Sequence, residues 1–197
     1  CGGLEMTDEI RVTIAAQAAL LVLHREGEYY PQLRTILVYP NAFVAPMKHV
    51  GPGGLVTEAH QPRLGESWTS GAIVLSWDDV VRGAADVHDG HNLVFHEFAH
   101  QLDSEDGGMN GAPLLGSAGR YREWARVLSA EYADLQRSVA RGDQVLIDRY
   151  GATNPAEFFA VVTELFFEQP AALRSRYPEL YAEFRAFYQQ DPAARVG

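Results

Sequence analysis

Cysteine is almost absent from this sequence. The one cysteine is Cys1, and a single thiol cannot close a disulfide within the chain. A fold held by disulfides is therefore excluded, and we expect a reducing compartment, which points to the cytoplasm. Long apolar runs are also missing, because no stretch approaches the roughly 18 consecutive apolar residues that a membrane-spanning helix requires. We therefore expect no membrane partner.

Positive charge is the next scarcity. The sequence has 16 Lys and Arg against 26 Asp and Glu, a formal net charge of −10. Binding to nucleic acid requires a basic surface that neutralises phosphates, so direct nucleic-acid binding is not expected. With 47% hydrophobic and 21% charged residues, the composition is that of a globular protein. The 197 residues can bury one sizeable core, so we expect residues 1–197 to form a single domain.

The most informative stretch runs from Gly90 to Asp103 and contains His-Glu-x-x-His at positions 96–100. Histidines four apart lie on one face of an α-helix, so His96 and His100 can bind the same ion. Glu97 projects beside that face, where a carboxylate can take a proton from an attacking water. The alternative is a chance match, in which two core histidines flank a solvated glutamate.

The residues around the motif favour a helix that presents the histidines to a cleft. Asn92 is a plausible helix start, and no helix-breaking residue follows until Gly107. An apolar stripe lies beside the histidine face and consists of Phe95, Phe98, Ala99 and Leu102. Such a helix packs on a core with one side and leaves the other free for a metal, so we predict a metal site.

The rest of the chain predicts an α+β fold that is mostly helical, with a small β-sheet beside the motif helix. Apolar spacing and capping residues predict helices over residues 7–24, 121–141, 155–168 and 174–190. Runs of β-branched and apolar residues predict strands over residues 33–39 and 67–77. The second strand is either an edge to which an extended peptide adds, or a buried central strand.

Two stretches are expected to lack extended regular structure. Residues 41–66 are rich in Pro and Gly and predict a loop, with at most a short strand near 55–58. Residues 78–90 are expected to connect the second strand to the motif helix, with at most one helical turn. His91 projects away from the metal-binding face, so we do not expect it to be a ligand.

A catalytic zinc takes three protein ligands and leaves one position open, so a third ligand must come from elsewhere in the chain. Asp103 shares the histidine face, but its side chain is short, and accepting an imidazole N–H suits it better. Glu157, Glu164 and Glu168 share one face of the predicted helix over 155–168. A solvated acidic face would look the same, and Glu157 also fits a helix-start signature. Residue chemistry therefore leaves Glu157 and Glu164 as rival third ligands.

The motif helix, His-Glu-Phe-Ala-His-Gln-Leu-Asp, resembles the active-site helix of the Mlc titration factor A family. These are bacterial zinc metallopeptidases, also called glucose-regulated metallopeptidases. The five-residue motif alone is common to many zinc peptidases, but further matches in the same order make the resemblance specific. It covers nearly the whole chain and includes Thr13–Ala18, Val74–Trp77, Tyr150–Glu157, Glu164–Phe167 and Phe187–Pro192.

The resemblance implies a site and a mechanism. It makes Glu157 the third ligand of one zinc ion, with Glu97 as the catalytic base and Tyr150 as the residue that stabilises the oxyanion. It implies a zincin-type α+β fold similar to the catalytic domain of the lethal-factor-type peptidases. Without the family, Tyr150 would be read as a half-buried aromatic residue before a helix. The family also implies that residues 1–197 lack an N-terminal segment of a longer parent chain.

The resemblance also implies an activity and a partner. The activity is aminopeptidase-like hydrolysis of short peptides, and the partner is the glucose-responsive repressor Mlc, which would link the chain to sugar uptake. The alternative is an interaction protein that sequesters a regulator and has a structural or vestigial zinc site. Structural zinc sites are usually closed by four protein ligands. The presence of Glu97, without a clear fourth ligand, favours the enzyme.

Overall fold

The computed structural model describes residues 3–25, 29–41, 43–50, 56–63, 65–68 and 71–195, with the backbone alone for the strands within 43–68. Its helices are α1 (Asp8–Val22), α2 (Trp77–Ala85), α3 (Leu93–Asp103), α4 (Ala118–Arg141), α5 (Pro155–Glu168), α6 (Pro170–Arg176) and α7 (Pro178–Tyr188). Three 3₁₀ turns are η1 (Ser104–Asp106), η2 (Arg149–Ala152) and η3 (Pro192–Ala194). The strands are β1 (Thr35–Tyr39), β2 (Phe43–Val50), β3 (Val56–Arg63), β4 (Gly65–Trp68) and β5 (Ala72–Ser76).

The described strands form two small sheets. The first has the order β1-β5-β4, with β1 parallel and β4 antiparallel to β5. The register pairs Thr35 with Ala72 and Gly65 with Leu75. The second sheet is the antiparallel pair β2 and β3. Because β5 is the central strand of its sheet, it is not an edge to which a peptide could add.

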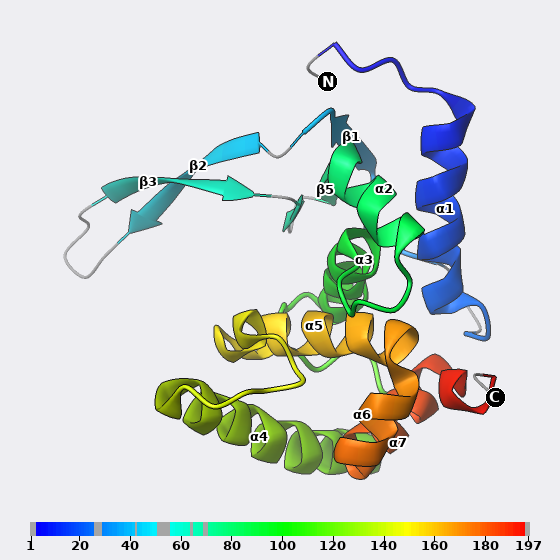
Figure 1. The fold of residues 1–197 in the computed structure, drawn as a ribbon, viewed down its shortest axis with the longest axis vertical. Helices are drawn as coiled ribbons and strands as arrows, with labels where there is room; N and C mark the ends of the chain where they lie inside the picture. The colour runs from blue at the N-terminus through cyan, green and yellow to red at the C-terminus, as the bar shows by residue number, and fades with distance from the viewer. Residues whose placement is uncertain are drawn as a thin grey trace.

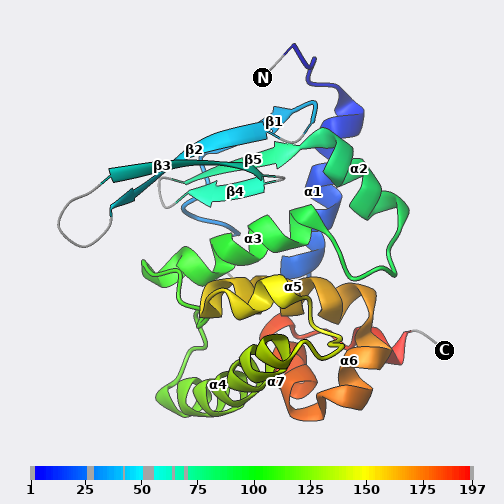
Figure 2. The same ribbon diagram turned by 60° about the vertical axis from the view of Figure 1, so that its left-hand side comes forward.

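Helices α3 and α5 lie side by side in the middle of the molecule (Figure 1). The sheet containing β1 and β5 lies on one side of this pair together with α1 and α2, and α4, α6 and α7 lie on the other side (Figure 2). The C-terminal end returns to α1, where the Gln190 side chain donates to the Leu20 carbonyl at 2.7 Å. Because elements pack on both sides of α3 and α5, these two helices join the two halves of the fold.

An aromatic cluster fills the space between α4, α5 and α7. Trp124 stacks on Phe184 with ring centroids 5.4 Å apart, and Phe159 meets Trp124 edge-on at 5.8 Å. Both phenylalanines are fully buried, and Trp124 is nearly so. Such rings bury large apolar areas and gain further from offset or edge-on geometry. The cluster thus fixes α5 from the side opposite α3.

Capping residues mark the ends of several helices. Thr7 accepts the Ile10 N–H at the start of α1, as the sequence predicted. Ser117 accepts the Arg120 N–H at the start of α4, which begins three residues before the predicted Tyr121. Gly142 ends α4 in the left-handed conformation, with φ 78°. A side-chain oxygen at the first position satisfies a backbone N–H that has no partner in the helix, and glycine enters the left-handed region without steric penalty.

The prediction of a loop over residues 41–66 was wrong, because β2 and β3 occupy much of that stretch. Pro46 and Pro62 argued against strands, since proline has no N–H to donate to a sheet. A two-stranded sheet tolerates proline, because each strand has one side without a ladder partner. The turn over residues 51–55, including Leu55 from the predicted short strand, lies outside the described residues.

Two further predictions of local structure were wrong. Residues 77–85 form the full helix α2 rather than a connection, with Asp78 and Asp79 in its first turn, where acidic side chains favour the helix dipole. The helix predicted over 174–190 is instead divided between α6 and α7 at Tyr177. The residue before a proline avoids the helical conformation, and Tyr177 has φ −133° and ψ 66° before Pro178.

Among the described helices, none is both long and apolar enough to cross a bilayer.

Candidate metal centre

Helix α3 places the two histidines of the motif on the side that faces α5. Asn92 begins the helix, and its side-chain oxygen accepts the Phe95 N–H at 3.0 Å. One turn apart, the rings of His96 and His100 bring their Nε2 atoms to within 3.2 Å of each other. The buried apolar residues of α3, including Val94, hold the helix on the core, so packing determines where the backbone of the two histidines lies.

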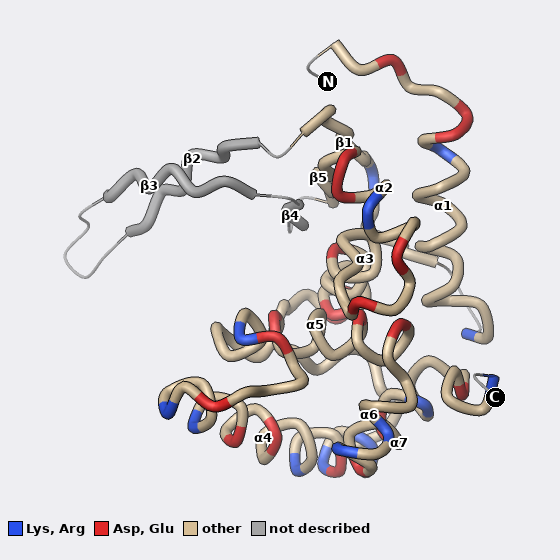
Figure 3. The backbone as a smooth tube through the Cα atoms, in the orientation of Figure 1, with Lys and Arg blue, Asp and Glu red and all other residues tan. Residues whose placement is uncertain are grey.

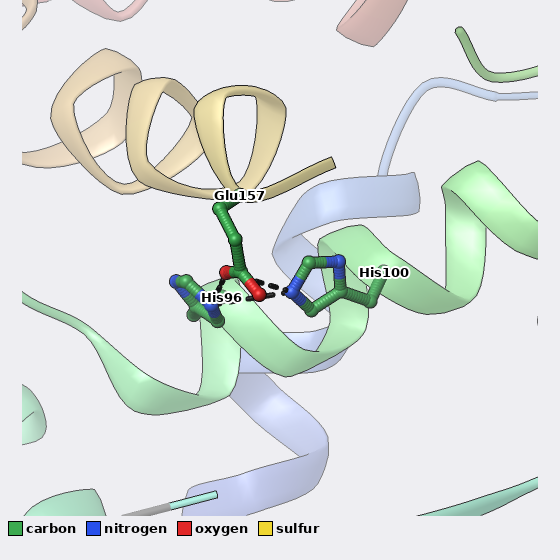
Figure 4. Close-up of side chains that lie close together, drawn as sticks. All are labelled: His96, His100 and Glu157. Carbon is green, nitrogen blue, oxygen red and sulfur yellow. Dashed lines mark hydrogen bonds and ion pairs between the residues drawn. The ribbon is translucent and has the colours of Figure 1, made fainter. Parts of the chain in front are cut away.

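Helix α5 supplies a carboxylate that points at both rings (Figure 4). Asn154 accepts the Glu157 N–H at 3.0 Å, and Pro155 occupies the first turn. Glu157 Oε2 lies 3.0 Å from His96 Nε2 and 3.3 Å from His100 Nε2. The helix-start signature and the ligand position are therefore compatible, because the backbone of Glu157 completes the cap while its side chain reaches the histidines.

The three atoms form a nearly equilateral triangle that fits a metal ion. His96, His100 and Glu157 are a group whose ligand atoms all lie within 4.8 Å of one another, and they could hold an ion. Ligand atoms about 2.0–2.1 Å from a tetrahedral ion lie roughly 3.3 Å from each other. The observed separations of 3.0, 3.2 and 3.3 Å agree with this spacing. Three ligands also leave a fourth tetrahedral position open.

The charges around the triangle also favour a cation. Helices α3 and α5 carry five acidic residues and neither Lys nor Arg (Figure 3), and the acidic residues are Glu97, Asp103, Glu157, Glu164 and Glu168. All except Glu157, which is mostly enclosed, are buried. Buried carboxylates are costly unless they are hydrogen-bonded or paired with positive charge. A metal ion bound by two neutral imidazoles and Glu157 would supply such a charge.

Hydrogen bonds among the same three side chains shift their pKa values. Burial lowers the pKa of His96, but hydrogen bonds to Glu157 and Glu164 outweigh burial and raise it well above 6.5. Burial dominates at His100 and lowers the pKa of its imidazole. For Glu157, burial raises the pKa, but the hydrogen bonds with His100 and His96 outweigh it and the net pKa is lowered. The carboxylate of Glu157 thus stays ionised beside the rings.

Glu164, the rival third ligand, contacts the other side of His96. Its Oε1 lies 2.7 Å from His96 Nδ1, whereas the metal-binding triangle contains Nε2. Its Oε2 accepts the backbone N–H of Asn92 at 2.5 Å. The structure therefore brings Glu157 into the triangle and places Glu164 behind the histidine ring.

The sequence suggested that Asp103 accepts an imidazole N–H, but in the structure it does not. Its Oδ2 accepts the Gly111 N–H at 2.7 Å, so it closes the loop that follows α3. Burial raises the pKa of Asp103 to about 6, although the backbone hydrogen bond from Gly111 opposes the rise. A side chain too short to reach back along α3 binds the nearest free N–H instead. His91 is exposed, in agreement with the expectation that it is not a ligand.

Glu97 and Tyr150 both lie beside the triangle. Glu97 is buried on α3, and its negative charge contributes to the raised pKa of His96. Tyr150 lies on η2, where Asp148 accepts its N–H at 2.7 Å. Its ring centroid is 6.0 Å from that of His96, and the residue is 53% exposed. Its side chain is therefore both close to the site and accessible to solvent.

The contact between Glu164 and His96 was missed by sequence reasoning. Glu157 and Glu164 are seven residues apart, two helical turns, so both face α3. The sequence signal was the shared acidic face, but periodicity does not tell which carboxylate meets which ring nitrogen. That choice depends on how α5 is translated along α3, which is a property of tertiary packing.

The fold and the metal-binding triangle agree with what comparison with known proteins finds. The chain belongs to the family described as glucose-regulated metallo-peptidase M90, whose model matches residues 1–189. The family is one of metallopeptidases, and His96, His100 and Glu157 could hold a metal ion.

Individual relatives match along nearly the whole chain. Uncharacterized protein slr2042 of Synechocystis sp. is 44% identical over 193 residues, covering 98% of this chain and 70% of that protein. Mlc titration factor A of Serratia proteamaculans is 38% identical over 197 residues, covering 98% and 74%. Mlc titration factor A of Yersinia pestis is 34% identical over 197 residues, covering 98% and 72%. The resemblance to the Mlc titration factor A family is thus confirmed.

Proposed function

We propose that the chain is a zinc-dependent peptidase with a zincin-type site. The observation that carries the proposal is the triangle of His96 Nε2, His100 Nε2 and Glu157 Oε2, with separations of 3.0–3.3 Å. Two imidazoles, one carboxylate and an open fourth position are the usual ligand set of a catalytic zinc. A bound zinc would polarise the scissile carbonyl and make water a stronger nucleophile.

The chain's own residues would move the protons and hold the developing charge. Glu97, next to His96 on α3, takes a proton from the attacking water and passes it to the leaving amine. The hydroxyl of Tyr150 donates to the carbonyl oxygen as that oxygen becomes negative. A donor that is fixed beside the reacting carbon stabilises the transition state more than the substrate, so it raises kcat.

The substrate class follows from the family resemblance. We propose short peptides, cleaved in an aminopeptidase-like manner, and a cytoplasmic location. The His96 and Glu157 side chains are 13% and 17% exposed, so the triangle is partly open to solvent. Tyr150 is 53% exposed and its ring lies 6.0 Å from that of His96, which supports a peptide that binds beside Tyr150.

The test of this function is Glu97→Gln. The amide keeps the size of the side chain but cannot accept and return a proton, so hydrolysis should fall by roughly 10²–10⁴-fold. We would measure cleavage of a mixture of short peptides by mass spectrometry and the zinc content of the same samples. Zinc should be retained in the variant. Cleavage at the wild-type rate by a fully folded Glu97→Gln would refute the proposed mechanism.

A second candidate function rests on the name of the relatives, Mlc titration factor A. As the alternative to a peptidase, we propose that the chain binds a repressor of the Mlc type and that its zinc site serves the fold or has no function. Pull-down of purified Mlc by the wild type and by His100→Ala would separate the two roles. Binding by the zinc-free variant would assign repressor binding to a surface other than the metal site. Absence of binding by the wild type would remove this candidate.

A further inference from the structure

We propose that Glu164 is a positioning residue that fixes the ring of His96 in the one tautomer able to bind metal. The inference rests on the proposed metal site but concerns a residue outside the ligand triangle. Glu164 lies on α5 two turns after Glu157 and is buried, 7% exposed, between α5 and the start of α3. Each of its carboxylate oxygens contacts a different group of α3.

The first contact identifies the role of the carboxylate. Glu164 Oε2 accepts the backbone N–H of Asn92, a group that can only donate. Asn92 cannot turn away, because its side chain caps α3 by accepting the Phe95 N–H. A group at position 164 must therefore present an acceptor to Asn92 and, with its second atom, meet His96.

The second contact determines the tautomer. Glu164 Oε1 lies 2.7 Å from His96 Nδ1, and Glu157 Oε2 lies 3.0 Å from His96 Nε2. A neutral imidazole has one N–H, and the shorter contact places it on Nδ1. The lone pair of Nε2 then points at the triangle, which is the arrangement that a ligating histidine needs.

The two histidines differ in this respect. Among the described residues, His100 Nδ1 is buried and has no hydrogen-bond partner, so no acceptor behind that ring determines its tautomer. The effect of Glu164 should therefore be confined to His96. An acceptor behind a ligating histidine is typically worth 10–100-fold in metal affinity.

The experiment compares Glu164→Gln with Glu168→Gln. Glutamine at 164 has one oxygen, which Asn92 N–H would take, so its amide N–H would face His96 Nδ1 and move the ring proton to Nε2. Glu168 is a matched control, because it is buried on the same helix and hydrogen-bonded to the Asn92 side chain at 3.0 Å. Among its described hydrogen bonds, none reaches His96.

Zinc affinity by chelator competition is the first readout. Glu164→Gln should bind zinc 10–100-fold more weakly than wild type. The zinc affinity of Glu168→Gln should stay within about threefold of wild type, because this substitution removes no hydrogen bond to a ligating histidine. Glu164→Asp, which keeps two acceptor oxygens, should bind more tightly than Glu164→Gln. Equal affinity of Glu164→Gln and wild type, or the reverse order of the two variants at position 164, would overturn the proposal.

Nitrogen-15 NMR of the histidine rings is the second readout, recorded on metal-free protein at a pH where both rings are neutral. Wild type should show the His96 proton on Nδ1, and Glu164→Gln should show it on Nε2. A wild-type proton on Nε2 would overturn the proposal. This measurement needs no metal. A wild type that binds no zinc would therefore refute the proposed function, while the NMR spectrum would still show which nitrogen of His96 carries the proton.

Discussion

At the residue scale, the site depends on a few atoms that must meet at hydrogen-bond distance. Glu157 Oε2 faces two imidazole nitrogens, and Glu164 Oε1 faces a third. Tyr150 contributes differently, because its ring is near His96 but the residue is half exposed. A tyrosine that is half exposed beside His96 can contact a substrate and contributes little to the buried core. We therefore expect it to affect turnover rather than folding.

Tyr150→Phe tests this expectation. Removal of the hydroxyl should lower kcat by roughly 10²–10³-fold, as for other oxyanion donors, while KM and zinc content change little. Steady-state kinetics on a cleaved peptide would separate the two parameters. An unchanged kcat with a raised KM would instead make Tyr150 a substrate-binding residue.

At the element scale, the loop between α3 and α4 determines where α5 begins. Gly111 donates its N–H to Asp103 and accepts the Trp124 indole N–H at 2.8 Å, so it joins the end of α3 to α4. It has φ +78°, and a Cβ there would overlap the Pro155 carbonyl oxygen. Only glycine fits this close approach, and Pro155 begins the helix that carries Glu157.

Gly111→Ala should therefore displace the start of α5. We expect a loss of stability of roughly 2–4 kcal/mol, from backbone strain and the steric overlap, and weaker zinc binding. Gly116→Ala is the matched control: its φ is +79°, but a Cβ would meet nothing within 4 Å. It should lose only about 1–2 kcal/mol and keep its zinc affinity. Chemical denaturation and chelator competition measure both effects, and equal losses in the two variants would contradict the role of Gly111.

At the scale of the whole molecule, buried acidic groups make stability depend on pH. Burial raises the pKa of Asp103 from 3.8 to about 6. Between about pH 4 and 6 the unfolded chain has therefore released this proton while the folded chain retains it. Because the folded state then binds more protons, the contribution of Asp103 to the free energy of unfolding falls as pH rises through this window.

Asp103→Asn should remove this contribution while its amide oxygen still accepts the Gly111 N–H. The free energy of unfolding of the variant relative to wild type should increase between about pH 4 and 6, by at most about 3 kcal/mol. It should stay constant above about pH 6. Urea denaturation at a series of pH values measures the difference. A relative stability that is constant with pH, or that declines over this window, would show that the pKa of Asp103 is not raised.

The sequence predicted those parts of the fold and site that local patterns encode. The His96 and His100 spacing, the Asn92 and Asn154 caps and the apolar stripe of α3 are all short-range signals, and they predicted both central helices. The β2–β3 pair was missed because strand pairing outweighs the local preference of proline. Residue chemistry could not predict that Glu157 lies in the triangle while Glu164 contacts His96 Nδ1, because this depends on how the two helices pack.

The central claim is that His96, His100 and Glu157 together hold one zinc ion, and the metal content of the purified chain tests it most directly. Elemental mass spectrometry of wild type, Glu157→Ala and Glu168→Gln should find about one zinc in the first and third, as a three-ligand site requires. Glu157→Ala should lose it while circular dichroism shows that it remains folded. A wild type that takes up no zinc, or a Glu157→Ala variant that keeps a full equivalent, would contradict the account.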